Sequence, residues 1–224
     1  MKPSLRLGLL AACLLAPAAL AHSVWVEPGP EGTLVVRFGE FDAEVEKSPG
    51  PLDSLGTPAG VVLPVTKDTK PLESLKMSDH YTLGGAKPDQ ALVAEVPFPV
   101  RAAEGKPARR PIFYGRWLPA GADKVAAEPA LTLDIVPTGT PGEARVFFRG
   151  KPLAGAKAQL NAPDGSHTPL KTDDNGLVKF TCTEPGRWVL TVPGHSEELP
   201  GFAGGKPYTI VSHNASLSWL AAKP

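Results

Sequence analysis

Histidine is the residue type with the clearest chemical potential in this sequence of 224 residues, which contains five of them. An imidazole ring can bind a transition metal through either of its nitrogens. The patterns typical of common catalysts are missing, since there is no Gly-x-Ser-x-Gly elbow, phosphate-binding loop, dinucleotide fingerprint or His-Glu-x-x-His pair. The sequence therefore favours a binding protein over an enzyme and assigns no catalytic residue.

Processing of the chain would give one histidine a special position. Residues 1–21 combine a basic start, an apolar run over 7–16 and the small-x-small ending Ala19-Leu20-Ala21, which are the three regions of a secretory signal peptide. The apolar run is too short for a membrane span, which needs about 20 residues. Cleavage after Ala21 makes His22 the first residue of an exported protein. A lipoprotein cleavage box ending at Cys13 is the alternative.

A terminal histidine offers two nitrogen donors to one metal ion. The α-amine released by cleavage has a pKa of about 8, so a metal displaces its proton readily near neutral pH. The amine and Nδ1 of the same residue close a chelate ring, and such nitrogen pairs suit Cu(II) or Ni(II). Further ligands must come from elsewhere in the fold, and the candidates are His213, His80, Glu40, Asp42, Glu44 and Glu46.

Each candidate also has a structural interpretation. Many exported proteins begin with an arbitrary residue, so a terminal histidine alone is weak support for a metal site. His80 could be an exposed loop histidine, and His213 lies on an apolar strand face, where a histidine is commonly held by a hydrogen bond. His167 and His195 are expected to be solvated turn residues. Packing roles are expected for Cys182 and for the strand residues Trp25, Trp117, Trp188 and Trp219.

The elements that must position these residues are expected to be β-strands. Proline (26) and glycine (23) are abundant and helical periodicity is nearly absent, which is typical of an all-β chain rich in turns. Strands are predicted at 23–28, 33–38, 60–65, 80–83, 91–96 and 111–117, and then at 131–137, 143–148, 156–160, 177–181, 186–192 and 208–220. The formal net charge of zero gives no footprint for nucleic acid and shows no polybasic membrane patch.

These strands predict two β-sandwich lobes, residues 22–128 and residues 129–224, connected through the stretch 119–129. The second lobe is expected to be a small Greek-key module of the transthyretin or collagen-adhesin type, completed by a closing strand. Its hairpin Asp173-Asp174-Asn175-Gly176 is well defined, because Asn-Gly supplies the positive φ that a tight turn needs. Residues 101–110 are predicted to form a polar loop.

A set of motifs spans nearly the whole mature chain. It includes His22-Ser-Val-Trp-Val-Glu27, Val36-Arg-Phe-Gly-Glu40, Phe113-Tyr-Gly-Arg-Trp117, Phe148-Arg-Gly-Lys-Pro-Leu-Ala-Gly-Ala156 and Ser212-His-Asn-Ala-Ser-Leu217. Together they resemble a bacterial periplasmic family of domains of unknown function that includes accessory proteins of nickel and cobalt uptake.

The resemblance implies a divalent transition metal (nickel, cobalt or copper) that is bound outside the inner membrane and passed to a membrane transporter. It maps the mature terminal histidine onto His22 and a second histidine onto His213. His80 matches an Asp-His-Tyr segment of similar relatives. We therefore expect His22 as the primary ligand, His213 and His80 as completing ligands, and Glu40 or Glu46 nearby.

The sequence is also compatible with two other functions. One is an envelope-binding or adhesin-like β-sandwich module that binds no metal and has scattered histidines. The other is an enzyme resembling the copper-dependent polysaccharide monooxygenases, which also use a terminal histidine but need a second converging histidine and an open flat face. None of the three predicts nucleic acid as a partner or membrane insertion of the mature chain.

Overall fold

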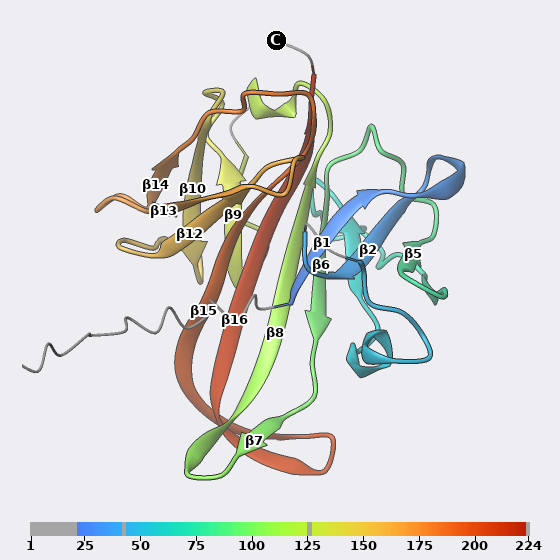
Figure 1. Cartoon of the computed structure of the whole chain (residues 1–224), viewed down its shortest axis with the longest axis vertical. Coiled ribbons are helices and arrows are strands. Elements are labelled where there is room, and N and C mark those ends of the chain that lie inside the picture. The colour runs from blue at the N-terminus through green and yellow to red at the C-terminus, as the bar shows by residue number, and fades with distance from the viewer. Residues whose placement is uncertain (1–21, 42–43, 125–126, 223–224) are drawn as a thin grey trace, which may run out of the picture.

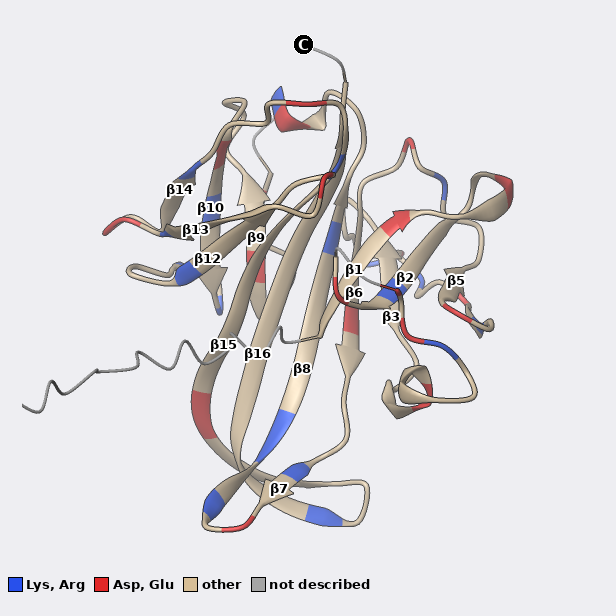
Figure 2. Cartoon of the chain, viewed as in Figure 1, with Lys and Arg blue, Asp and Glu red and all other residues tan. Residues whose placement is uncertain are grey.

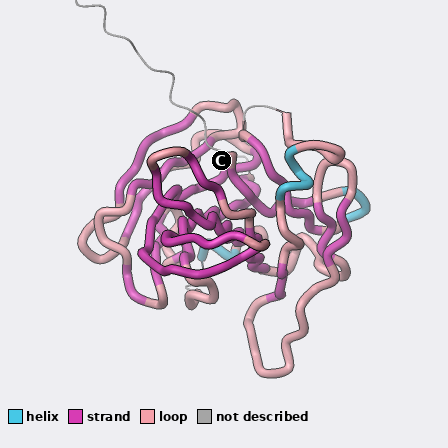
Figure 3. Tube along the Cα trace, turned by 90° about the horizontal axis from the view of Figure 1, so that it is seen from below, coloured by secondary structure: helices cyan, strands magenta, loops and turns pink. Residues whose placement is uncertain are grey.

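The computed structural model describes residues 22–41, 44–124 and 127–222, and its regular secondary structure is almost entirely β-strand, which confirms the all-β prediction (Figure 1). The helical segments are three short 3-10 turns between strands, η1 (Pro30–Gly32), η2 (Pro51–Ser54) and η3 (Ala122–Lys124). Figure 3 shows how little of the molecule they form. The signal peptide expected at residues 1–21, with Cys13, lies outside the described residues. In the described part, no helix has the length and apolar content needed to cross a membrane.

A central sheet of eight strands runs along the long axis of the molecule (Figure 1). In spatial order it contains β13 (His167–Lys171), β12 (Lys157–Asn161), β15 (Gly186–Ala203), β16 (Lys206–Ala221), β8 (Lys106–Leu118), β6 (Leu92–Pro97) and β3 (Ala59–Val62), with β7 (Arg101–Ala103) also paired to β8. The β8–β16 pair is parallel and the other pairs are antiparallel.

Two smaller sheets pack on opposite faces of the central sheet. The first contains β1 (Ser23–Pro28), β2 (Leu34–Gly39), β5 (Tyr81–Leu83) and β4 (Ser74–Lys76). The second contains β9 (Leu133–Pro137), β10 (Glu143–Phe148), β11 (Lys151–Pro152) and β14 (Leu177–Lys179). The fold is therefore a sandwich of three β-layers that encloses two hydrophobic cores.

Alternation along β8 shows how one strand serves both cores. Phe113 and Trp117 belong to the first core, whereas Tyr114 and Leu118 belong to the second. Successive side chains of a strand point to opposite faces, so one strand can carry two apolar stripes. Gly115 lies under β1, where an added Cβ would meet the Val26 side chain at 3.0 Å, so a glycine here allows the close crossing of β1 over the central sheet.

The two cores are drawn from different halves of the chain, the first from residues between 24 and 117 and the second from residues between 114 and 221. The second core includes Tyr114 and Leu118, which lie before the expected boundary between residues 128 and 129. The central sheet also contains strands from both halves, because β16 pairs with β8 over ten residues. The two lobes therefore share one sheet.

The main error of the sequence prediction concerns two hairpins, β7–β8 and β15–β16, at the end of the molecule drawn at the bottom of Figure 1. Residues 101–110, predicted as a loop, form the β7–β8 hairpin. Strand β15, predicted to end at Val192, continues with two register shifts to Ala203. These extensions are mostly solvent-exposed on both faces, so they lack the apolar alternation that reveals a strand in a sequence.

Candidate functional site

His22 lies directly before β1 at the edge of a surface cavity of about 460 Å³. The segment after β2 turns back here: Gly39 bridges to Val45, and the Glu46 amide donates to the Phe38 carbonyl at 2.8 Å. This return brings acidic residues to the cavity, which is lined by His22, Glu40, Glu44, Val45, Glu46, Lys47, Pro49 and Pro51. Asp42 lies outside the described residues.

The His22 ring is held by one strong polar contact. Its Nε2 is hydrogen-bonded to Oε1 of Glu46, and the ring packs on Phe38 with centroids 5.2 Å apart. A carboxylate can only accept, so Nε2 carries the proton and the lone pair of this tautomer is on Nδ1. Within the described part of the chain, no hydrogen bond is made to Nδ1 of His22. The side chain is 43% exposed, so this nitrogen is accessible to an ion from solvent.

His213 is placed on the other side of the central sheet. Its neighbour Asn214 and the residue Ser216 line a small crevice together with His22, and the Ser216 hydroxyl donates to the Val24 carbonyl of β1. Because side chains alternate along β16, His213 points away from that crevice, toward the second core. The expected pairing of His22 with His213 in one metal site is therefore not formed.

In that second core, His213 is only 2% exposed and fully hydrogen-bonded. Its Nε2 donates to Oε2 of Glu197 at 3.3 Å, and its Nδ1 lies 2.9 Å from the Tyr114 hydroxyl. Burial lowers the pKa of His213, although the Glu197 carboxylate opposes this shift. Arg149 in turn binds Glu197 through two nitrogens, at 3.0 and 2.8 Å. His213 is thus a neutral core histidine that connects β8, β15 and β16.

His195 lies opposite His213 on β15, with ring centroids 6.4 Å apart, and packs edge-on against Phe148. It is partly buried and belongs to a strand, which corrects its prediction as a solvated turn residue. Burial lowers the pKa of His195 as it does that of His213. Both rings are therefore held mainly in the neutral form near pH 7.

His80 is buried at 7% exposure and does not line the His22 cavity. Its Nδ1 donates to Asp79 at 2.6 Å, and Asp79 also accepts from Arg37 at 2.6 Å. Burial opposes ionisation of Asp79, but the bonds from His80 and Arg37 outweigh it and lower its pKa. Arg37 continues the chain of charges to Glu27. The Nδ1 of His80 is therefore engaged in a hydrogen-bonded network that links β2 to the segment before β5.

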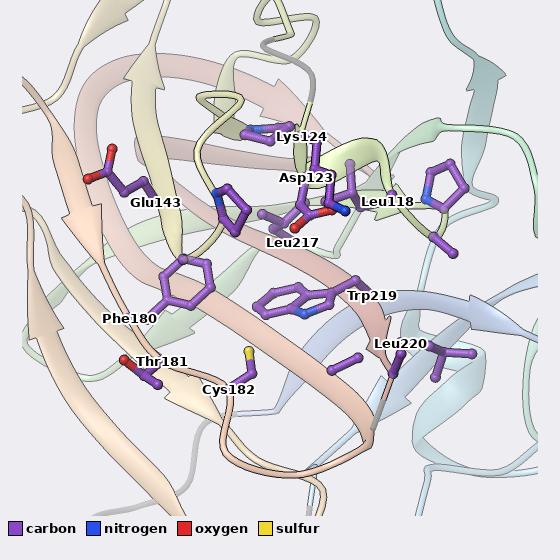
Figure 4. Close-up of a pocket in the computed structure, with 18 residues that line it drawn as sticks. Leu118, Asp123, Lys124, Glu143, Phe180, Thr181, Cys182, Leu217, Trp219 and Leu220 are labelled. Atoms are coloured by element: carbon purple, nitrogen blue, oxygen red, sulfur yellow. The ribbon is translucent and has the colours of Figure 1, made fainter. Parts of the chain in front are cut away.

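A second cavity, of about 520 Å³, lies beside the ends of β8 and β16 (Figure 4). Figure 4 shows Phe180, Cys182, Leu217 and Trp219 around one hollow, and the Phe180 and Trp219 rings pack 5.3 Å apart. Burial raises the pKa of the Cys182 thiol, which therefore remains protonated near neutral pH. The thiol is thus a packing group, and the cavity is a mainly apolar space.

Across residues 22–41, 44–124 and 127–222, no three side chains of His, Cys, Asp or Glu are arranged so that they could hold a metal ion. The grouping nearest to a metal site is therefore the His22 cavity, where one histidine and the carboxylates of Glu40, Glu44 and Glu46 share a space. A complete site there requires donors other than side chains. The main chain supplies one if the amide of His22 becomes a free amine.

Comparison with known proteins identifies one family. A sequence model described as a domain of unknown function, DUF4198, matches residues 19–195, which is most of the chain. No curated protein matches this sequence. No solved structure matches it either.

Proposed function

The chain belongs to the DUF4198 family, and from the geometry at His22 we propose that it is an exported protein that binds a divalent transition metal through its mature amino terminus. The metal is cargo in this proposal: nickel, cobalt or copper is taken up in the periplasm and delivered to a membrane transporter. The motif resemblance to accessory proteins of nickel and cobalt uptake supports this assignment.

The observation that carries the proposal is the contact between His22 and Glu46. By accepting a hydrogen bond from Nε2–H, Glu46 fixes the ring and leaves the lone pair of Nδ1 free to bind a metal. Nδ1 is the nitrogen that can close a chelate ring with the α-amine of the same residue. Carboxylates that orient metal-binding histidines in this way raise the basicity of the ring, and their loss typically weakens metal binding about 10- to 100-fold. Glu46 thus has an orienting role in the proposed site.

The remaining ligands would come from the carboxylates that line the same cavity, Glu40 and Glu44. Glu44 is the more accessible of the two for an incoming ion, because its side chain is 89% exposed and pairs with the exposed Lys47 at 3.2 Å. Two nitrogens with carboxylate or water oxygens suit a tetragonal Ni(II) or Cu(II) ion. An open site of this kind can also release its ion to a partner, which a delivery protein requires.

The test compares protein that begins at His22 with the same protein extended by one alanine. The extension turns the amine into an amide, so nickel binding measured by isothermal titration calorimetry should fall at least 100-fold. Below the amine pKa of about 8, affinity of the processed protein should also fall about tenfold per pH unit from this proton alone. Glu46→Gln should lose about 10- to 100-fold, and His167→Ala, on exposed β13, should lose nothing. Equal affinity of processed and extended protein would refute the proposal.

The two alternatives to this proposal are a copper monooxygenase and an envelope-binding or adhesin-like module that binds no metal. A copper monooxygenase needs a second histidine beside the first, and among the described residues that line either cavity at His22 there is no other histidine. The envelope-binding module without metal is supported by one observation, the mainly apolar cavity around Trp219, which offers space for an apolar group of a partner. Quenching of tryptophan fluorescence by an apolar probe in wild type, and its loss in Trp219→Leu, would support that second candidate.

A further inference from the structure

Two hairpins extend beyond both hydrophobic cores at one end of the molecule, at the bottom of Figure 1. They are the turn between β7 and β8 and the turn between β15 and β16, and the parallel pairing of Ile210 with Arg109 holds them side by side. We call residues 101–110 and 198–210 together the basic tip. It is the part of the described chain farthest from the C-terminal end (Figure 1).

The basic tip concentrates positive charge on a chain whose formal net charge is zero, so the expectation that the chain has no polybasic patch is wrong at this end of the molecule. Its cations are Arg101, Lys106, Arg109, Arg110 and Lys206, and its acids are Glu104 and Glu198. Figure 2 shows these cations as blue segments around the projecting hairpins. Among the ion pairs of residues 22–41, 44–124 and 127–222, none includes any of the five cations, although eight arginine or lysine pairs with acids occur elsewhere.

The arrangement of these cations works against stability. Arg101 lies directly opposite Arg109 across the β7–β8 ladder. Like charges facing each other across two strands destabilise the pair, and no acid of the described chain neutralises them. Arg101 and Arg110 instead lie over the rings of Phe98 and Tyr208, at 4.5 and 5.8 Å, which orients their charges without cancelling them. An anionic partner outside the chain would remove this cost.

The same tip exposes large apolar side chains. Phe202 is 71% exposed and Leu199 is 43% exposed, and Phe202 pairs with Pro207 beside the Lys206 turn. An exposed aromatic ring that projects with cations around it fits the boundary of a lipid bilayer, where the ring enters the headgroup layer and the cations meet anionic headgroups. A protein partner of acidic character would match the charge, but a protruding hairpin whose exposed aromatic ring, Phe202, points to solvent fits a soft, extended surface better.

We propose that the basic tip is a peripheral docking surface for an anionic lipid bilayer. Adsorption would hold the long axis of the molecule upright on the membrane, with both cores outside the lipid. This inference is independent of the metal proposal, because neither the His22 cavity nor any of its lining residues belongs to the tip.

The experiment measures sedimentation of the protein with vesicles of phosphatidylcholine alone and of phosphatidylcholine with phosphatidylglycerol. Binding is expected only with phosphatidylglycerol and should weaken with salt. Each cation near an anionic surface contributes about fivefold in partitioning, so the double variant Arg101→Gln with Arg109→Gln should bind about 30-fold more weakly. Phe202→Ser should lose about tenfold while keeping its dependence on salt.

The matched control is the double variant Lys67→Gln with Lys70→Gln, which removes the same charge from an exposed loop outside the tip and should bind as wild type. Circular dichroism of each variant establishes that it is folded. Equal binding to both vesicle types, equal loss in the control variant, or no binding to either vesicle would overturn the proposal. The last result would assign the tip to an acidic protein surface instead.

Discussion

Replacing His213 with alanine separates a structural histidine from a metal ligand. The structure buries this ring between Tyr114 and Glu197, with Phe148 packed edge-on at 5.1 Å. Removal would break the hydrogen bond between the Tyr114 hydroxyl, in a residue only 2% exposed, and the His213 ring, at a cost of about 1–3 kcal/mol. The space left by the ring adds about 2 kcal/mol, as for other large-to-alanine changes in cores. We expect a total loss of about 3–5 kcal/mol in the free energy of unfolding.

Urea unfolding followed by tryptophan fluorescence measures this loss, and calorimetry measures nickel affinity of the same variant. Affinity of folded His213→Ala should match that of wild type. The pH dependence gives a second readout, because the lowered pKa of His213 means that its contribution is present above about pH 6.5 and is lost as pH falls through its folded-state pKa. Wild type should therefore lose stability on acidification more steeply than the variant.

His195→Ala is the matched control, since it removes a partly buried ring from the same cluster. It should cost less than His213→Ala and leave the Tyr114 bond intact. If His213→Ala changes the free energy of unfolding by less than about 1 kcal/mol but weakens nickel binding tenfold or more, the histidine is a ligand. The assignment of His22 and His213 to opposite faces would then be wrong.

The remaining predictions concern stability. Asp134 is 1% exposed and accepts hydrogen bonds from Arg116 at 3.0 and 2.6 Å, which joins the central sheet to β9. Asp134→Ala would leave the arginine buried without its partner, so the free energy of unfolding in urea should fall by about 3–5 kcal/mol. The double variant Asp134→Leu with Arg116→Met should recover most of that loss, and a loss equal to the sum of the single variants would contradict the buried pair. Gly176→Ala should cost clearly more than Gly105→Ala by thermal unfolding: both have positive φ, but only at Gly176 would a Cβ meet main-chain atoms, at 2.8 Å. Equal losses would show that backbone conformation alone sets the cost.

Local patterns in the sequence were sufficient to predict most of the strands that form the two cores. The alternation at 23–28 and 143–148 and the Asn175-Gly176 turn each reflect interactions within a few residues, and the structure contains β1, β10 and the turn at these places. The turn does not close the predicted hairpin, because it joins β13 of the central sheet to β14 of the β9–β10–β11–β14 sheet. The polar hairpin at 101–110 was missed, because a strand exposed on both faces has no apolar stripe to reveal it. Its high density of arginine and lysine was the signal available in the sequence.

The sequence by itself determined what His22 would offer after the proposed cleavage, since the amine and the imidazole of one residue would be neighbours by covalent structure. Only the tertiary structure decided its surroundings. Glu46 reaches the ring through the Gly39–Val45 bridge, while the same sheet that brings Asn214 to His22 turns His213 to the opposite face. The physical reason is that the alternation of side chains along a strand is a local property, which the sequence shows directly. The pairing of β8 with β16 joins residues about a hundred positions apart, and it decides which face of β16 packs against the first core and which against the second.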